Sequence, residues 1–504
     1  MKKTTLWFML FLILLSLGRQ LTAAPLKETS SLIPARQLLA DFSILKKAYE
    51  QLHPGLYRYN NQTQIDAHFK ELETKLNQDL TLQQAYLAFS IFLAKIKCGH
   101  SYPNFYNQPK AVAEALFKGQ NKVPFYFRWI NGRMIVTKNF SESTRLKSGT
   151  EVLSINGVAV KKILERLMTI SRADGSNDAK RVSYLEVAGE NNYEAFDVYF
   201  PMFFPISNNR FDLRVKDFLS SKSETLNVQA LTYEQRLIPI KAEVEKRRGG
   251  SEQVWDAKLL NEQTAYLRMP TWALFNSKWD WKQFLESFFD RLVQGKVTDL
   301  IIDLRGNEGG LSVGDVILSR LIKQDLRLEQ FKRSVRYRKV TEDLVPYLDT
   351  WDKSFMDWGE SAVDLNNGFY TLKKYDDDKQ GNVIKASNRP FNGRTFILID
   401  ASNSSATFEF AQTVQQNKLA TLIGQPSGGN QRGINGGAFF FLRLPNSKIE
   451  IDLPLIGFFP PEERVDGGLH PDILIKPNIK DVALGIDTEM MALRKYIEIK
   501  DTNK

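Results

Sequence analysis

Apolar residues recur at helical spacing through the first hundred residues of the chain. The recurring positions are Leu38, Phe42, Leu45, Tyr49 and Leu52, then Leu82, Tyr86, Phe89, Leu93 and Ile96. Steps of three and four residues predict amphipathic helices that each bury one face. The tripeptide His53-Pro54-Gly55 is typical of a turn between two of them. We therefore expect an N-terminal helical domain of about three helices over residues 24–105.

Short aromatic-rich and alternating segments replace this spacing between residues 106 and 240. The expected strands are 125–129, 133–137, 151–155, 194–200 and 225–229. The dipeptides Asn131-Gly132 and Asn156-Gly157 lie between expected elements and are typical of tight turns. The pattern predicts a small β-rich domain.

Strands and helices alternate from about residue 250 to residue 480. Expected strands are 264–268, 299–303, 395–400 and 420–423, and expected helices are 281–293, 313–323 and 406–416. Apolar strands that alternate with helices predict a parallel sheet covered on both faces, which is an α/β fold. A polar, aromatic segment at about 325–390 reads as an insertion, and residues 481–504 as a C-terminal helix or tail.

Residues 1–23 have the pattern of a secretory signal peptide. Lys2 and Lys3 precede an apolar run of 12 residues, and Leu21-Thr22-Ala23 offers a cleavage site before Ala24. The run is shorter than the roughly 20 residues that span a bilayer, although a retained anchor stays open as an alternative. We expect an exported bacterial protein, periplasmic or secreted, with no stable membrane span after cleavage.

Composition narrows the chemistry. The 504 residues include one Cys and four His, with 68 Lys and Arg against 58 Asp and Glu. One Cys excludes an intrachain disulfide framework, and the absence of His-Glu-x-x-His excludes a zincin site. The basic residues are spread among acids, which argues against nucleic-acid binding. We expect neither a metal nor another cofactor.

Two turns carry candidate chemistry. The expected strand at 395–400 leads through Ser404 and Ser405 into a helix that begins near Ala406, the geometry of an activated serine; a simple helix N-cap is the alternative. The glycine-rich turn Gly306-Asn307-Glu308-Gly309-Gly310 follows another buried strand. Such a turn can direct backbone N–H groups at an oxyanion, although a plain tight turn also fits.

Only one histidine has a catalytic context. His100 lies at a domain junction in Cys98-Gly99-His100-Ser101, just after a long expected helix. The other three, His53, His68 and His470, have the surroundings of structural residues. Cys98 is expected to be a small packing residue.

These segments together resemble peptidase family S41, the tail-specific or C-terminal-processing proteases and their tricorn-like relatives. The resemblance extends over essentially the whole mature chain. The matching segments, in the order of the family, are Gly99-His100-Ser101-Tyr102, Leu146–Val158, Ile302–Gly310, Ser404-Ser405-Ala406 with Phe410-Ala411, Gly424–Gly429 and Gly468–Ile473. Each motif alone is weak, whereas six in order are specific.

The resemblance implies a role for each site residue. Ser405 aligns with the nucleophile, and His100 with the histidine of the tricorn-like branch. Glu463 fits the triad acid best, with Glu462 and Asp466 as rivals. Gly309 or Gly310, together with Ala406, would hold the oxyanion.

The chain also departs from the family pattern in three places. Asn430, with Arg432 close by, stands where the Ser-Lys branch has its lysine, and neither side chain can act as a neutral base. The nucleophile helix of the family often has a Glu three residues after the serine, whereas this chain has Phe408 at that position and Glu409 at the next. The β-rich region lacks a clear Gly-Leu-Gly-Phe carboxylate loop.

We therefore expect a ClpP/crotonase-like α/β catalytic domain with a helical N-terminal domain and a PDZ-like domain. The expected activity is that of an exported serine endopeptidase whose partner is a polypeptide substrate. The alternative is a non-catalytic protein of the same fold that binds peptides or another ligand. The sequence does not decide the oligomeric state.

Overall fold

The N-terminal region is helical, as its apolar spacing predicts. The computed structural model describes residues 31–189, 193–219, 222–239, 253–373 and 382–502, so the expected signal peptide lies outside the described residues. The helices are α1 (Ala35–Leu52), α2 (Gln62–Leu76), α3 (Leu82–Ile96) and α4 (Lys110–Phe117). Asn61 and Thr81 begin α2 and α3 with capping boxes, in which a side chain accepts a hydrogen bond from an otherwise unpaired helix N–H.

The β-rich region forms a six-stranded antiparallel sheet in the order β1-β2-β3-β5-β6, with β4 paired to β3. Its strands are β1 (Phe125–Ile130), β2 (Arg133–Asn139), β3 (Glu151–Ile155), β4 (Val158–Ala159), β5 (Arg210–Lys216) and β6 (Ser223–Gln229), and its helices are α5 (Val160–Met168), α6 (Asp178–Tyr184) and α7 (Ala195–Phe203). The expected strand at 194–200 is wrong, because this segment lies in α7. Eight of the helix's nine residues are buried, so no polar face reveals a helical period in the sequence.

The C-terminal half contains the predicted α/β sheet, in the order β20-β17-β16-β9-β8-β7. All neighbours are parallel except β7 and β8. The strands are β7 (Asp256–Leu259), β8 (Thr264–Arg268), β9 (Asp299–Asp303), β16 (Arg394–Ile399), β17 (Thr421–Gly424) and β20 (Ile473–Leu474). The helices are α9 (Trp281–Gln294), α10 (Val313–Leu321), α12 (Ala406–Gln416), α13 (Ile479–Leu484) and α14 (Thr488–Thr502).

Both faces of this sheet are covered, which explains its continuous apolar strands. In β9, Leu300 and Ile302 pack with residues of α9, α10 and α12, whereas Ile301 packs on the other side with α14. The alternation follows from the two-residue period of a strand. The mixed α/β class that the sequence predicts is thus observed.

The segment at 325–390 contributes strands to a separate sheet in the order β12-β18-β19-β11-β14-β13. Its strands are β11 (Lys332–Val335), β12 (Leu348–Asp349), β13 (Ala362–Asp364), β14 (Tyr370–Leu372), β18 (Asn435–Arg443) and β19 (Glu450–Phe459). A short pair, β10 (Leu326–Arg327) with β15 (Val383–Ile384), and three 3-10 turns, Val345–Tyr347, Lys353–Met356 and Gly359–Ser361, complete the segment.

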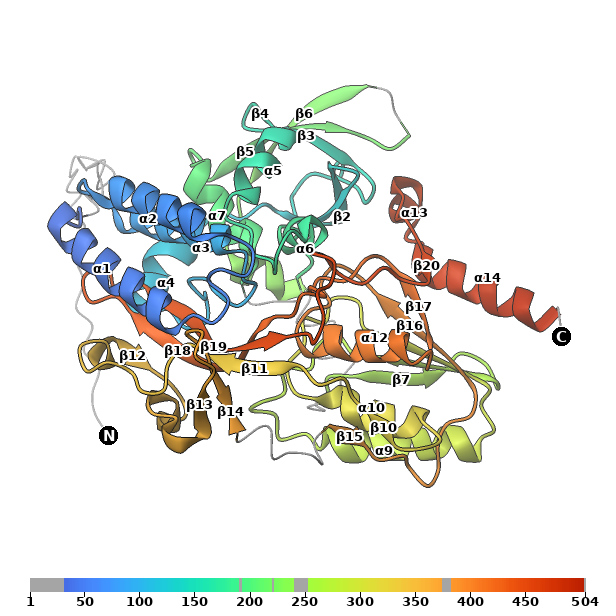
Figure 1. Cartoon of the computed structure of the whole chain (residues 1–504). Helices are drawn as coiled ribbons and strands as arrows, with labels where there is room; N and C mark the ends of the chain where they lie inside the picture. Colours follow the sequence, from blue (N-terminus) through green and yellow to red (C-terminus); the bar gives the residue numbers. More distant parts are fainter. Residues whose placement is uncertain (1–30, 190–192, 220–221, 240–252, 374–381, 503–504) are drawn as a thin grey trace, which may run out of the picture.

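The β18–β19 hairpin leaves the α/β domain and packs against the N-terminal helices (Figure 1). The buried Asp41 carboxylate of α1 accepts hydrogen bonds from the backbone N–H groups of Asn446 and Ser447, and Tyr49 donates to the Asp452 carbonyl. The N-terminal helices and the β18–β19 hairpin therefore share one core. Among the described helices, none is both long and apolar enough to cross a bilayer.

Candidate active site

Ser405 lies at the turn between β16 and α12, in a strained backbone conformation. Its φ is 52° and its ψ is −131°, a region that side-chain-bearing residues rarely adopt. It occupies the N-cap position of α12 but makes no capping hydrogen bond with its side chain. Ser404, in contrast, donates its hydroxyl to the Glu308 carbonyl at 3.3 Å. The plain N-cap alternative for Ser405 therefore lacks its defining contact.

The glycine-rich turn lies directly against this serine. A Cβ at Gly309 would be 2.9 Å from the Ala406 nitrogen and 3.0 Å from the Ser405 Cβ, so the approach requires glycine. Gly310 packs instead against the backbone of Trp272. The Gly309 N–H donates to the buried Asn307 side chain at 2.9 Å. Of the three predicted oxyanion donors, Gly309 and Ala406 lie beside Ser405, and the Gly309 N–H donates to Asn307.

His100 lies in a cavity of about 190 Å³ that Ser404 also lines. The charged groups around it are the carboxylates of Asp174, Glu308 and Asp452 and the cations of Arg172 and Lys180; the Tyr102 phenol also lines the cavity. Burial lowers the pKa of His100 below its usual range; the Asp174 carboxylate opposes this shift, and Arg172 adds to it. A lowered pKa keeps the imidazole neutral at pH 7 and thus able to accept a proton. The buried Nδ1 has no hydrogen-bond partner within the described part of the chain.

A segment that the sequence did not single out contacts the turns that carry the candidate site residues. Arg172 donates to the Gly99 carbonyl, next to His100, at 2.5 Å and pairs with Glu308 at 3.4 Å. Lys180 Nζ lies 2.6 Å from Glu308 Oε1 and 3.0 Å from the Ser402 carbonyl. One stretch of the β-rich region thus binds the histidine segment, the glycine turn and the serine turn.

No motif marks this stretch in the sequence. Residues 171–180 read Ser-Arg-Ala-Asp-Gly-Ser-Asn-Asp-Ala-Lys, a polar run without periodicity that resembles any surface loop. Burial is the signal that identifies it: the Lys180 side chain is only 4% exposed, which is exceptional for a lysine. That burial follows from tertiary packing.

Glu308 is the carboxylate that these cations hold ionised. Its packing alone would raise its pKa, but the neighbouring Lys180 and Arg172 lower the pKa to about 2. Since the Glu308 side chain is 41% exposed, part of this attraction is screened by solvent. The charge state is nevertheless clear, because a carboxyl with this pKa is ionised throughout the neutral range.

The structure does not bring the predicted triad acid to His100. Glu463 is 87% exposed and pairs with Arg432 at 3.5 Å, outside the cavity. Its rival Asp466 accepts hydrogen bonds from Ser176 N at 2.8 Å and from Asn430 Nδ2 at 2.7 Å. Asn430 also donates to the Asp174 carbonyl at 3.0 Å. Asp466 therefore stabilises the segment around Asp174 through Ser176 and Asn430 and does not line the cavity, whereas Asp174 lines it together with His100.

The other histidines have no catalytic partners in the described structure. Buried His53 accepts a hydrogen bond from Gly55 N at Nδ1, so its Nε2 carries the proton and donates to Ser101 Oγ at 2.9 Å. His470 is exposed, and His68 lies partly buried in α2. Cys98 is a buried free thiol that accepts a hydrogen bond from Asn435. Among the described residues, no three His, Cys, Asp or Glu side chains form a group suited to a metal ion.

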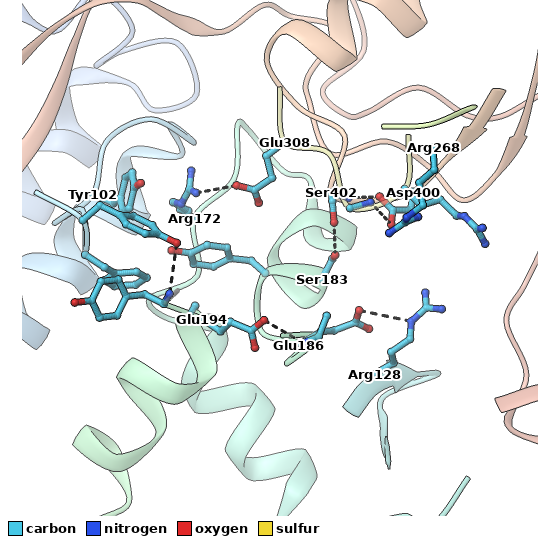
Figure 2. A pocket seen from close by; sticks show the side chains of 18 residues that line it. Tyr102, Arg128, Arg172, Ser183, Glu186, Glu194, Arg268, Glu308, Asp400 and Ser402 are labelled. Carbon is cyan, nitrogen blue, oxygen red and sulfur yellow. Dashed lines mark hydrogen bonds and ion pairs between the residues drawn. The ribbon is translucent and has the colours of Figure 1, made fainter. Parts of the chain in front are cut away.

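A second cavity of about 330 Å³ adjoins the first and shares Tyr102, Arg172 and Glu308 with it. It lies between the β-rich region and the α/β domain. Figure 2 shows aromatic rings at one end, with Arg172 beside Tyr102, and Arg128, Arg268 and Asp400 towards the other end. Ser183 and Ser402, whose hydroxyls are 3.3 Å apart, contact each other across the boundary.

A strained serine at a helix N-terminus, a glycine turn against it and a neutral histidine nearby are the parts of a serine-hydrolase site on an α/β fold. Comparison with known proteins agrees with this class. Residues 263–475 match the family model described as Peptidase family S41. This match lies within the α/β domain and supports a serine-type peptidase.

Solved structures extend the likeness beyond that domain. Mature CPAF complexed with lactacystin superimposes with a TM-score of 0.60 at 14% identity, covering 89% of this chain and 95% of CPAF. A second structure, of mature CPAF, gives a TM-score of 0.58 at 14% identity, and the match covers 89% of this chain and 94% of that one. At this identity the likeness establishes a shared fold. The search of curated proteins found no match.

Proposed function

We propose that this protein is an exported serine endopeptidase that hydrolyses peptide bonds through an acyl-enzyme on Ser405. The observation that carries the proposal is the strained conformation of Ser405 at the start of α12, directly against Gly309. His100 acts as general base and then as general acid. The family match supports a polypeptide substrate, and the pattern of residues 1–23 supports export.

The reaction follows the general logic of serine peptidases. His100 takes the proton of Ser405 Oγ as the oxygen attacks the scissile carbonyl, and then returns it to the leaving amine. A water molecule that gives its proton to His100 then attacks the acyl-enzyme, and His100 returns the proton to Ser405 Oγ as the acid product leaves. The N–H of Ala406 stabilises the oxyanion together with the N–H of Gly309 or Gly310. Use of the Gly309 N–H requires its release from Asn307.

We assign the acid that supports His100 to Asp174, because Asp174 lines the same cavity and accepts the Gly99 N–H at 2.9 Å. The competing assignment is Glu463, which the family resemblance favours. That assignment requires the loop at 461–468 to carry Glu463 from its solvent-exposed pair with Arg432 into the cavity. The two assignments predict different effects of substitution.

The family branch and the β-rich domain complete the proposal. A histidine that precedes the nucleophile, and Asn430 in place of lysine, favour the tricorn-like branch. We propose that the β-rich domain is PDZ-like and holds an extended segment of the substrate. Its antiparallel sheet and its contacts with the glycine turn are consistent with this role.

Fluorophosphonate labelling of the mature protein tests the proposal. We expect the label on Ser405, found by peptide mass spectrometry, and loss of both label and casein hydrolysis in Ser405→Ala. Ser404→Ala is the matched control and should keep the label. An unlabelled Ser405 in a folded protein, or full peptidase activity of Ser405→Ala, would contradict the mechanism.

A second candidate function is non-catalytic binding of peptides. Two observations favour it. The Gly309 N–H donates to Asn307, and the His100 Nδ1 has no hydrogen-bond partner among the described residues. In that case the labelling experiment fails, while peptides still bind with measurable affinity and Ser405→Ala binds them equally well.

A further inference from the structure

The larger cavity lies where part of a bound substrate would reach. Its wall includes Gly306 and Ser402, from the two turns that build the catalytic site, and it shares Arg172 and Glu308 with the cavity of His100. Its volume of about 330 Å³ is within the range of small-molecule and side-chain sites. A side chain close to the scissile bond can therefore enter it.

The arginines and Asp400 that line this cavity already have partners. Arg128 pairs with Glu186 at 3.7 Å, and Arg172 with Glu308 at 3.4 Å. Asp400 accepts hydrogen bonds from two backbone N–H groups at 2.9 and 3.1 Å. The two remaining arginines that line the cavity, Arg268 and Arg305, both pair with Asp303. A charged ligand group would have to break one of these pairs, which disfavours it.

The opposite end of the cavity is aromatic. Its walls are Tyr102, Phe105, Tyr106, Tyr184 and Tyr193. The ring centroids of Tyr106 and Tyr193 are 5.3 Å apart and nearly perpendicular, and those of Phe105 and Tyr193 are 6.3 Å apart. Tyr106 is 52% exposed, so part of the residue is accessible to solvent. Rings arranged edge to face favour a further aromatic ring.

Two buried polar atoms of the cavity lining, Glu194 Oε2 and Arg172 Nε, have no hydrogen-bond partner among the described residues. Glu194 is 7% exposed, and its Oε1 accepts hydrogen bonds from Gly189 N and Ala188 N. Its buried Oε2 has no hydrogen-bond partner within the described residues, and the side chain lines the cavity. An unsatisfied buried oxygen is costly, and a ligand hydroxyl can satisfy it.

We propose that this cavity is a specificity pocket that binds an aromatic side chain, Tyr or Phe, of the substrate next to the scissile bond. This inference rests on the proposed peptidase function. The ring packs against Tyr106 and its aromatic neighbours, and a tyrosine hydroxyl reaches Glu194 Oε2. Burial, with the repulsion of Asp197, raises the pKa of Glu194 to about 8, so the carboxyl is mostly neutral at pH 7 and tolerates a ring beside it.

Cleavage of a defined peptide library tests the inference. The library carries each residue at each position around the cut, and mass spectrometry identifies the sites. We expect Tyr and Phe to be favoured over Asp and Lys at one position by about tenfold in kcat/KM, because the cavity buries the apolar surface of one ring. Tyr106→Ala should reduce this preference severalfold, and Tyr106→Phe should retain it.

The control is Phe275→Ala, since Phe275 is an exposed aromatic residue that lines neither cavity. It should leave the preference unchanged. Preference for acidic or basic residues, no preference at all, or an unchanged preference in Tyr106→Ala would overturn the inference. These results differ from a failure of the proposed function, in which Ser405 is not labelled and no peptide is cut.

Discussion

Replacement of Ser405 by glycine should stabilise the protein while it abolishes activity. The φ of 52° is close to the left-handed helical region, but the ψ of −131° lies far from it. A side-chain-bearing residue held outside the common regions costs on the order of 1–3 kcal/mol. Glycine removes that cost but loses roughly 0.5–1 kcal/mol through its greater freedom in the unfolded chain. The net gain in unfolding free energy is about 1 kcal/mol.

The matched comparison is Ser405→Ala, which removes the same hydroxyl and keeps the strained Cβ. Both variants should be inactive, yet only Ser405→Gly should unfold later. In thermal unfolding the difference should be roughly 2–4 °C for a domain of this size. Calorimetry or circular dichroism of the two variants side by side measures it. Equal stability of the two variants would refute the reasoning, since it would mean that the serine conformation carries no strain in solution.

Three further predictions concern charge. Lys180→Met should shift the acidic limb of the pH profile of kcat/KM to higher pH, and Glu308→Gln should shift it to lower pH. Each shift should be a few tenths of a pH unit to about one unit, because the two variants remove opposite charges beside His100. Equal shifts in the same direction would rule out an electrostatic role. Asp174→Asn should reduce kcat at least about a hundredfold while Glu463→Gln changes it less than threefold, as steady-state kinetics will show, and the reverse order would return the acid role to Glu463. Burial, with the charge of Arg58, lowers the pKa of His53 to about 3, so its stabilising effect is complete above pH 6.5 and is lost as the pH falls towards 3; chemical unfolding of His53→Gln should show a decline shallower by up to about 1.4 kcal/mol per pH unit in that window.

Local signals were enough to predict much of the secondary structure. The helix at 406–416 and the strands at 264–268 and 299–303 are observed with the predicted limits. The error at 194–200 has a physical cause: the helix is buried on nearly every side, so its aromatic residues show no helical period and resemble a strand. Periodicity separates a helix from a strand only where one face is exposed to water, whereas the fully buried strand at 299–303 was recognised as a short apolar run.

The site divides in the same way. Ser405, Gly309 and Ala406 lie within short segments whose turn and helix signals are readable along the chain. Lys180 was missed, because its contacts with Glu308 and Ser402 join residues 128 and 222 positions apart. Nothing in the local sequence distinguishes a lysine that will be buried against a catalytic turn from one that will be solvated.

The sequence by itself determined the elements of the α/β sheet, the order of the S41-like motifs and the position of the serine turn, because each element and each motif is a short segment with its own local signal. Tertiary structure decided which side chains meet around His100. It placed Asp174, Arg172 and Lys180 there and left Glu463 in solvent. It also carried the β18–β19 hairpin onto the N-terminal helices. The reason is that burial and ion pairing between distant segments depend on how whole domains pack, which no short stretch of sequence encodes.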